Sequence, residues 1–347
     1  MRCARALLVL LSALASTPAG PAEQERRPPV PRHVYEDGVY AVAFSPDGTL
    51  LASGGSGPVR VWEVATGTMV RALPSRAGAV WFLADGALLT VETAPNGASA
   101  CVWDAATGQQ VRRFPVARGP YALSSEGRTL AAGGSLTPRG ERVAAVTLYD
   151  TGTGLPRASF APGLATLAMA FTADGRLAVF GASPSCASGV LRDCDGIQVW
   201  DALAGRLERR LASPPGDVMT IAASPDGSRI VAGESDGADL PDGYISALDP
   251  DTGRLTRRWK AHTGRVQALA FSPDGRRLYS GDRFGELAAW PGAAPTGGRA
   301  FPRGAAGSVY QLAVSPDGRW LAQADSHWRT SLVVLRDAGT GRVAWAR

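Results

Sequence analysis

The sequence has few of the side chains that bind metals or act as nucleophiles. It contains four cysteines and three histidines among 347 residues. The histidines, His33, His262 and His327, are far apart, and no spacing of cysteine and histidine matches a zinc cluster. Neither a Gly-x-Ser-x-Gly elbow nor a phosphate-binding glycine loop is present. The sequence therefore predicts no metal site, no cofactor and no catalytic residue.

Lysine is nearly absent from the chain. Lys260 is the one lysine among 36 basic residues, and the formal net charge is +5. The arginines are spread along the chain, whereas a face that binds nucleic acid needs a basic patch. We therefore expect no nucleic-acid partner.

Long hydrophobic runs are also absent beyond the N-terminus, so no membrane span is expected after residue 22. Before that point, two arginines, a short apolar run at 6–15 and small residues up to Ala22 form the pattern of a secretory signal peptide, residues 1–22. An uncleaved segment that tethers the protein to the membrane is the alternative. The sequence predicts an exported protein, periplasmic or secreted, with a flexible proline-rich lead at 23–32.

Glycine and proline are plentiful, with 42 and 25 residues, and many of them stand in a repeated turn. The stretch VQALAFSPDG, residues 266–275, returns as VYAVAFSPDG and as VYQLAVSPDG. In such a turn proline presets the first dihedral angle, aspartate bonds back to backbone amides and glycine takes a positive φ. Aligned on this glycine, the chain contains seven copies from about residue 33 to the end. The aligned glycines are Gly48, Gly86, Gly127, Gly175, Gly227, Gly275 and Gly318.

Each copy contains four short segments separated by turn residues, which is the pattern of a four-stranded antiparallel blade. The first segment is apolar on both sides with a small residue at its centre, such as Ala43 or Ala270. This predicts an innermost strand packed between neighbouring blades. Trp81 stands at the small-residue position of the second copy, where it either fills a local gap or plugs a central channel. Because each unit exposes apolar faces that only its neighbours can cover, we expect a closed ring.

Seven such units resemble a WD-repeat β-propeller. The stretch HTGRVQALAFSPDG, residues 262–275, carries one part of the resemblance, and an aromatic–acidic pair in the third segment carries the other. These pairs are Trp62–Glu63, Trp103–Asp104, Tyr149–Asp150 and Trp200–Asp201. The resemblance covers residues 33–347. It implies a bacterial, exported, all-β protein folded as a seven-bladed β-propeller of four-stranded antiparallel blades.

In that family a histidine, a serine or threonine, an aspartate and a tryptophan form a hydrogen-bonded set. Only the sixth copy approaches the set, with His262, Ser280 and Trp290. Phe284 stands at the aspartate position, and Asp282 is nearby but displaced. We therefore expect the blades to depend mostly on apolar packing, and His262 to be structural.

The copies differ in length almost only between their second and third segments. The longest connections are 135–144, 182–196 and 234–243, and the seventh copy adds 325–330. In a propeller these connections emerge on one face, here called the loop face, and the short Asp-Gly and Thr-Gly turns occupy the opposite turn face. Because loops on a rigid scaffold often carry binding residues, we predict a monomeric scaffold that binds a protein partner. The candidate partner-binding residues are Arg139, Glu141, Arg142, Arg192, Asp193, Asp236, Asp239, Asp242, Tyr244, His327, Trp328 and Arg329.

The cysteines of the longest connection suggest a further feature. Cys186 and Cys194 lie close in sequence, which predicts a disulfide in an exported protein. Two free thiols in a reduced protein are the alternative. Cys101 is then an unpaired, buried strand residue.

Two further candidates each have a simpler interpretation. The connection with Glu234, Asp236, Asp239 and Asp242 carries the oxygen ligands that calcium prefers. Its spacing matches no known calcium loop, and we interpret it as a solvated acidic loop. Trp328 either anchors an interface or folds over the edge of its blade.

The alternative function is enzymatic. The stretches ISALDPDTGRLTRRW, residues 245–259, and VVLRDAGTGRVAWA, residues 333–346, resemble repeats of quinoprotein propellers. That resemblance implies a small ligand at the channel mouth, because larger members of the family oxidise alcohols or sugars with pyrroloquinoline quinone. It covers two copies only, and the adjacent cysteine pair of many such enzymes is missing. The sequence favours a non-catalytic protein.

Overall fold

The computed structural model describes residues 38–134, 145–182, 195–237, 242–292, 294, 296–302, 307–327 and 330–347. These residues belong to one compact unit, Pro31–Arg347, and the predicted signal peptide and lead lie outside them. Their regular elements are all strands. The described residues contain no helix that is long and apolar enough to cross a membrane.

The strands form seven four-stranded antiparallel sheets, numbered here as blades 1 to 7 in chain order. Blade 1 contains β1 (Val39–Phe44), β2 (Leu50–Gly55), β3 (Val59–Glu63) and β4 (Met69–Leu73). Blade 2 contains β5 (Ala77–Phe82), β6 (Leu88–Ala94), β7 (Gly97–Trp103) and β8 (Gln110–Val116). Blade 3 contains β9 (Tyr121–Leu123), β10 (Thr129–Gly134), β11 (Ala145–Asp150) and β12 (Pro156–Phe160).

The remaining blades follow the same order. Blade 4 contains β13 (Ala165–Phe171), β14 (Arg176–Ala182), β15 (Asp195–Asp201) and β16 (Arg206–Arg210). Blade 5 contains β17 (Asp217–Ala223), β18 (Ile230–Ser235), β19 (Gly243–Leu248) and β20 (Leu255–His262). Blade 6 contains β21 (Val266–Phe271), β22 (Arg277–Asp282), β23 (Leu287–Pro291) and β24 (Arg299–Ala300). Blade 7 contains β25 (Ser308–Val314), β26 (Trp320–His327), β27 (Thr330–Asp337) and β28 (Val343–Ala346).

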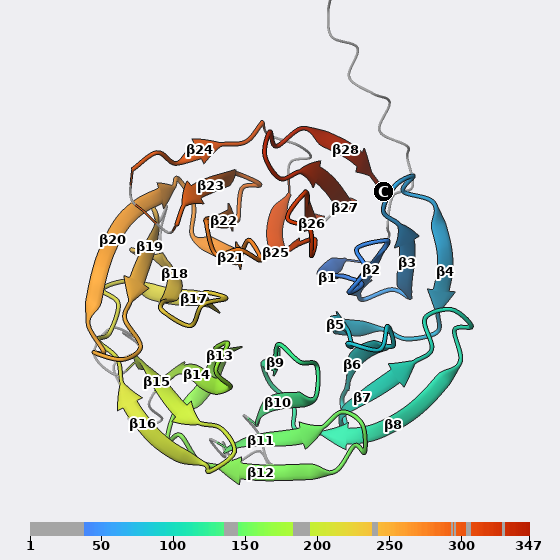
Figure 1. Cartoon of the computed structure of the whole chain (residues 1–347), viewed down its shortest axis with the longest axis horizontal. Helices are drawn as coiled ribbons and strands as arrows, with labels where there is room; N and C mark the ends of the chain where they lie inside the picture. The colour runs from blue at the N-terminus through green and yellow to red at the C-terminus, as the bar shows by residue number, and fades with distance from the viewer. Residues whose placement is uncertain are drawn as a thin grey trace, which may run out of the picture. The chain divides into compact units, whose positions relative to one another are not determined.

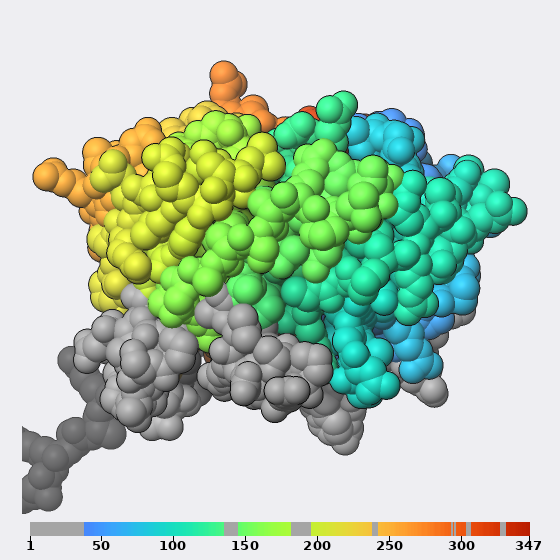
Figure 2. Space-filling view, turned by 90° about the horizontal axis from the view of Figure 1, so that it is seen from below, coloured from blue at the N-terminus to red at the C-terminus, as the bar shows by residue number. Residues whose placement is uncertain are grey.

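The blades are arranged in a ring, as the sequence predicts. The first strand of each blade lies nearest the centre, and the fourth strand lies at the rim (Figure 1). Figure 2 shows blades 2, 3 and 4 side by side along this rim, in teal, green and yellow. The predicted all-β, seven-bladed architecture is therefore confirmed.

The hydrophobic core lies between the blades rather than at the centre of the ring. Each of seven clusters of buried residues joins two neighbouring blades. Leu89 and Val91 of blade 2, for example, pack in one cluster with Leu130 and Ala132 of blade 3. Trp81 packs against the same cluster, together with residues of the three-residue strand β9. Trp81 therefore fills a gap between two blades.

The repeated turn has the predicted hydrogen bonds. Gly48 adopts a φ of 71°, a conformation that side chains other than glycine rarely take. The Ser45 hydroxyl donates to Asp47 Oδ1 at 2.5 Å, and the Thr49 amide donates to the same oxygen at 3.1 Å. These bonds, the Ser45 bond first, hold the pKa of Asp47 below its usual range. The Asp47 carboxylate thus closes the turn through its hydrogen bonds.

Within the described part of the chain, C-terminal residues alone close the ring. Blade 7 takes all four of its strands from the end of the chain. Arg347 exchanges two backbone hydrogen bonds with Val333 of β27. The Trp345 indole donates to the Val64 carbonyl at 2.8 Å, and Arg347 Nε donates to the Gly67 carbonyl at 2.9 Å. A Cβ at Gly67 would lie 2.8 Å from the Trp345 ring, so glycine allows this close approach.

We expect Trp345→Ala to lower the free energy of unfolding by about 3–5 kcal/mol, because Trp345 is only 8% exposed and packs in the cluster between blades 7 and 1. Trp345→Phe keeps most of the packing and should cost about 1–2 kcal/mol through the lost hydrogen bond. Urea unfolding measures both changes. Val343→Ala, on the same strand but 38% exposed, is the control. A loss for Trp345→Ala no greater than that of the control would contradict this account of ring closure.

Candidate functional site

The structure describes three of the predicted partner-binding side chains, Asp236, Asp242 and Tyr244. The others lie outside the residues or side chains that it describes, as do the two cysteines of the predicted disulfide. They are Arg139, Glu141, Arg142, Arg192, Asp193, Asp239, His327, Trp328, Arg329, Cys186 and Cys194. Cys101 is described: it is unpaired and fully buried, as predicted, and burial raises its pKa to about 11.

The three described side chains stand at the loop-face end of blade 5. The Asp236 amide donates to the Asp242 carbonyl at 3.2 Å, which closes the base of the connection. Lys260 Nζ lies 2.5 Å from Asp242 Oδ2, and this hydrogen bond raises the pKa of Lys260. The Arg258 guanidinium lies over the Tyr244 ring, 3.9 Å from its centroid.

Arg258 and Lys260 were not predicted, although a signal for them exists. Both stand on β20, and the strand register places Lys260 opposite Tyr244. Alternate residues of a strand share a face, and residues opposite each other on neighbouring strands have adjacent side chains. The register of β19 and β20 therefore determines which side chain of β20 lies next to Tyr244.

Two predictions about this face are wrong. Glu234 does not belong to a solvated acidic loop, because it stands in β18 and is fully buried. It accepts hydrogen bonds from the Gly216 amide at 2.9 Å and from Arg258 Nε at 3.1 Å. The segment 325–330 is also not a long loop. Most of it continues β26 and begins β27, so that only residues 328–329 connect the two strands.

The inner strands carry exposed side chains where they begin, at the loop-face end of the ring. In six of them one residue interrupts the pairing with the second strand, as in a β-bulge. These residues are Tyr40, Gly78, Leu167, Met219, Gln267 and Tyr310. Tyr40, Leu167 and Tyr310 are 39%, 48% and 44% exposed. The rings of Tyr40 and Tyr310 meet edge to face, with centroids 5.2 Å apart.

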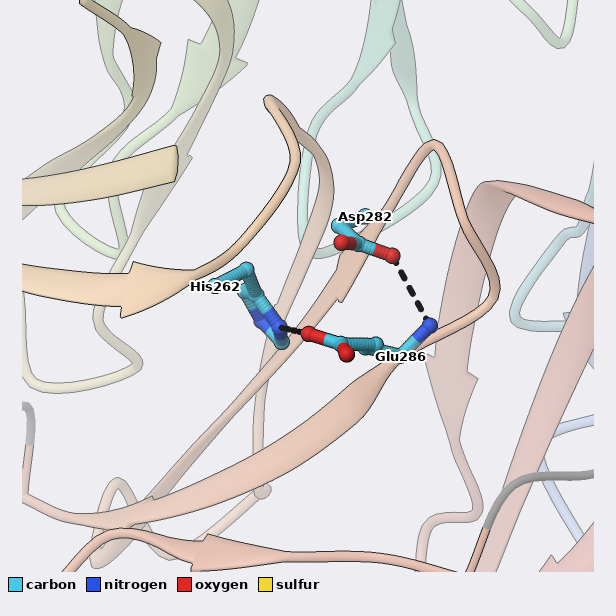
Figure 3. A group of neighbouring side chains, drawn as sticks. All are labelled: His262, Asp282 and Glu286. Carbon is cyan, nitrogen blue, oxygen red and sulfur yellow. Dashed lines mark hydrogen bonds and ion pairs between the residues drawn. The ribbon is translucent and has the colours of Figure 1, made fainter. Parts of the chain in front are cut away.

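Blade 6 holds a buried polar network at the same face. His262 Nε2 lies 2.7 Å from the Ser280 hydroxyl, which also accepts a hydrogen bond from the Trp290 indole at 2.8 Å. His262 Nδ1 lies 3.8 Å from Glu286 Oε2 (Figure 3). Burial lowers the pKa of His262 to about 4, against the opposing effect of Glu286, so the ring is neutral at neutral pH. The carboxylate beside this histidine thus belongs to Glu286.

Among the described residues, histidine, serine and tryptophan bond together only in blade 6, as expected, but the tryptophan half of the set recurs in other blades. The Trp62 indole donates to Ser53 Oγ at 2.9 Å in blade 1. The Trp103 indole donates to Thr90 Oγ1 at 2.9 Å in blade 2. In blade 4 the Trp200 indole donates to Gln198 Oε1, also at 2.9 Å. The third-strand indoles of blades 1, 2, 4 and 6 thus each have a polar side-chain partner, whereas the buried indole N–H of Trp259 on β20 has none.

Blade 7 replaces the tryptophan with an arginine. Arg336 pairs across the sheet with Leu321, as Trp290 pairs with Leu278, and its side chain is fully buried. Arg336 Nε donates to Gln323 Oε1 at 3.2 Å, and Gln323 Nε2 donates to Asp325 Oδ2 at 3.3 Å. Burial raises the pKa of Asp325 to about 7, although Arg336 opposes this shift.

A groove of about 990 Å³ lies on the turn face between blades 2 and 3, away from the predicted loop face. Its lining includes Arg112, Arg157 and Asp150. Arg112 donates to the Thr151 carbonyl at 3.1 Å, and Arg157 pairs with Asp150. These charged groups bond to each other or to the backbone, and the groove holds no nucleophile with an adjacent base.

Comparison with known proteins agrees with this architecture, which defines a seven-bladed β-propeller. The family model described as WD domain, G-beta repeat matches residues 29–63 and 253–284. The chain is therefore similar to WD repeats over these two segments, and its seven blades show the β-propeller fold.

A solved structure shares this fold. The structure titled Kuenenia stuttgartiensis Hydrazine Synthase is similar to this chain, with a TM-score of 0.72 and 15% identity. The match covers 92% of this chain and 100% of that one. At this identity the likeness concerns the fold alone. No sequence among the curated proteins matches the chain.

We expect Ser280→Ala to lower the free energy of unfolding by about 2–4 kcal/mol, because it leaves both His262 and Trp290 without their buried partner. Ser53→Ala in blade 1 removes the partner of Trp62 alone and should cost about 1–2 kcal/mol. Urea unfolding of the two variants gives the comparison. Equal losses would show that Ser280 does not support the histidine.

Asp325 makes stability depend on pH. Its folded pKa of about 7 lies above the value of about 3.9 in an unfolded chain, so the folded state holds the proton more tightly. Its contribution to the free energy of unfolding therefore falls as pH rises from 4 to 7. Asp325→Asn should therefore change the free energy of unfolding more favourably at pH 8 than at pH 5. The difference between the two effects should be about 2–3 kcal/mol. Chemical unfolding at the two pH values tests this, and an effect independent of pH would contradict it.

Proposed function

We propose that the protein is an exported, non-catalytic scaffold that binds a protein partner on its loop face. The observation that carries the proposal is the difference between the two faces. The connections between first and second strands are of similar length, from 45–49 in blade 1 to 315–319 in blade 7. Those between second and third strands range from residues 95–96 in blade 2 to 183–194 in blade 4. Variable connections on a rigid ring are suited to recognition.

The inner strands offer apolar surface where they begin on this face. Tyr40 and Tyr310, from adjacent inner strands, present a paired aromatic surface, and Leu167 is exposed on the inner strand of blade 4. Tyrosine is among the residues most often found at the energetic centre of protein interfaces. Apolar side chains ringed by polar loops form the usual pattern of such an interface.

Blade 5 supplies charged groups on the same face. Arg258 is held against Tyr244 by Glu234, and Lys260 is paired with Asp242. Because Arg258 is fixed by two contacts, it loses little side-chain freedom on binding. This arrangement supports a partner that combines apolar side chains for the channel mouth with polar groups for the surrounding loops.

Capture from an envelope extract tests the proposal, with residues 23–347 as bait. Replacing Tyr40 and Tyr310 together by alanine should reduce capture of the partner at least ten-fold. Shortening the connections 135–144, 183–194 and 236–242 to the length found in blade 1 should have the same effect. Leu203→Ala is the matched control, because Leu203 is 67% exposed on a Thr-Gly-type turn of the turn face. Equal capture by the wild type and the loop-face variants, or loss of capture in Leu203→Ala, would place the binding surface elsewhere.

A further inference from the structure

Three side chains suited to metal binding converge at the loop-face end of blade 6. His262 ends β20, Asp282 ends β22, and Glu286 immediately precedes β23 (Figure 3). One ligand atom from each lies within 4.8 Å of the others. Three separate segments of the chain therefore bring an imidazole and two carboxylates to one place.

Hydrogen bonds to surrounding groups hold these side chains in position. His262 Nε2 is engaged by Ser280, so its Nδ1 faces Glu286. Asp282 Oδ1 accepts hydrogen bonds from the amides of Phe284 at 2.9 Å and Glu286 at 2.8 Å. Outer hydrogen bonds of this kind orient the ligands of protein metal sites.

The other oxygen of Asp282 has no such bond. Asp282 is fully buried, and no side chain donates a hydrogen bond to its Oδ2, which faces the backbone of Gly264. A buried carboxylate oxygen without a partner is costly, and a cation beside it would offset the cost.

The equivalent positions in blades 2 and 5 have a basic partner that Asp282 does not have. Glu92, at this position in blade 2, lies 3.2 Å from Arg113 on β8. Glu234, at this position in blade 5, lies 3.1 Å from Arg258 on β20. Both partners stand on the outer strand of the same blade. The outer strand of blade 6, β24, is only Arg299–Ala300, and no ion pair joins Asp282 to a basic side chain within the described part of the chain.

We propose that His262, Asp282 and Glu286 bind a divalent transition-metal ion, with zinc as the best fit. One imidazole nitrogen and two carboxylate oxygens are ligands that zinc accepts. In a tetrahedral zinc site, neighbouring ligand atoms lie about 3.4 Å apart. The three ligand atoms, now within 4.8 Å of one another, must therefore move closer together on binding. The Glu286 side chain, 22% exposed, is the one with room to move. Three protein ligands leave a fourth position for water or for a group from a partner.

Cobalt provides the first test, because Co²⁺ takes zinc sites and gives visible absorption bands that report its coordination. Metal-free protein titrated with Co²⁺ should develop these bands at one equivalent, and Zn²⁺ should remove them. Zn²⁺ should also raise the melting temperature, since an ion that binds only the folded state stabilises it. Glu286→Gln and Asp282→Asn should each weaken Zn²⁺ binding at least ten-fold.

Glu92→Gln is the matched control, because it changes the equivalent carboxylate in blade 2 and should leave the zinc affinity unchanged. Absence of the cobalt bands and of a zinc-dependent melting shift in the wild type would overturn the proposal. So would equal affinity in Glu286→Gln, which would indicate binding to other groups such as cysteine thiolates. If Asp282→Asn does not fold, the more exposed Glu286→Gln decides the question. These readouts are independent of partner capture, so this inference and the proposed scaffold function can fail separately.

Discussion

The packing of each blade against its two neighbours is the constraint on which the rest of the structure depends. The inner strands are apolar on both sides, and their central alanines, such as Ala43 at 8% exposed, let adjacent sheets approach closely. Every buried cluster spans two blades, so no blade has a complete core by itself. The ring must close for all seven clusters to be buried, which gives the contacts of Trp345 with blade 1 their importance.

Within this apolar frame, two positions of the blade are repeatedly polar. In six blades the third strand presents a tryptophan, a tyrosine or, in Arg336, a buried charge. A nearby side chain or, for Tyr149, a backbone amide forms a hydrogen bond with it. The end of the second strand presents Glu92, Glu234, Asp282 or Asp325 in four blades. How each carboxylate is compensated differs: an arginine on the outer strand, a bridging glutamine, or, as inferred for Asp282, a metal ion. A carboxylate thus recurs at the same position of these four blades, and the group that compensates its charge differs between them.

The two faces of the ring differ for a related reason. On the turn face, side chains such as Asp47 and Ser45 form hydrogen bonds within the turns. Few of their donor and acceptor atoms are therefore available to bind a partner. On the loop face the connections begin and end on rigid strands but are not needed to define them. Binding groups can therefore be added there without disturbing the inter-blade packing, and the charged group of blade 5 and the tyrosine pair of blades 1 and 7 both lie on that side.

The repeated Ser-Pro-Asp-Gly turn, the small residue of the inner strand and the fourfold segment pattern were sufficient to predict the strands, their order and the number of blades. These features are local, because turn chemistry and strand periodicity depend on neighbouring residues. The sequence alone did not determine that Glu286 stands beside His262 or that Arg113 and Arg258 neutralise carboxylates two strands away. Nor did it determine that Trp345 reaches Val64 across 281 positions of sequence. Those contacts depend on strand register and on which blades become neighbours, and the tertiary structure decides both.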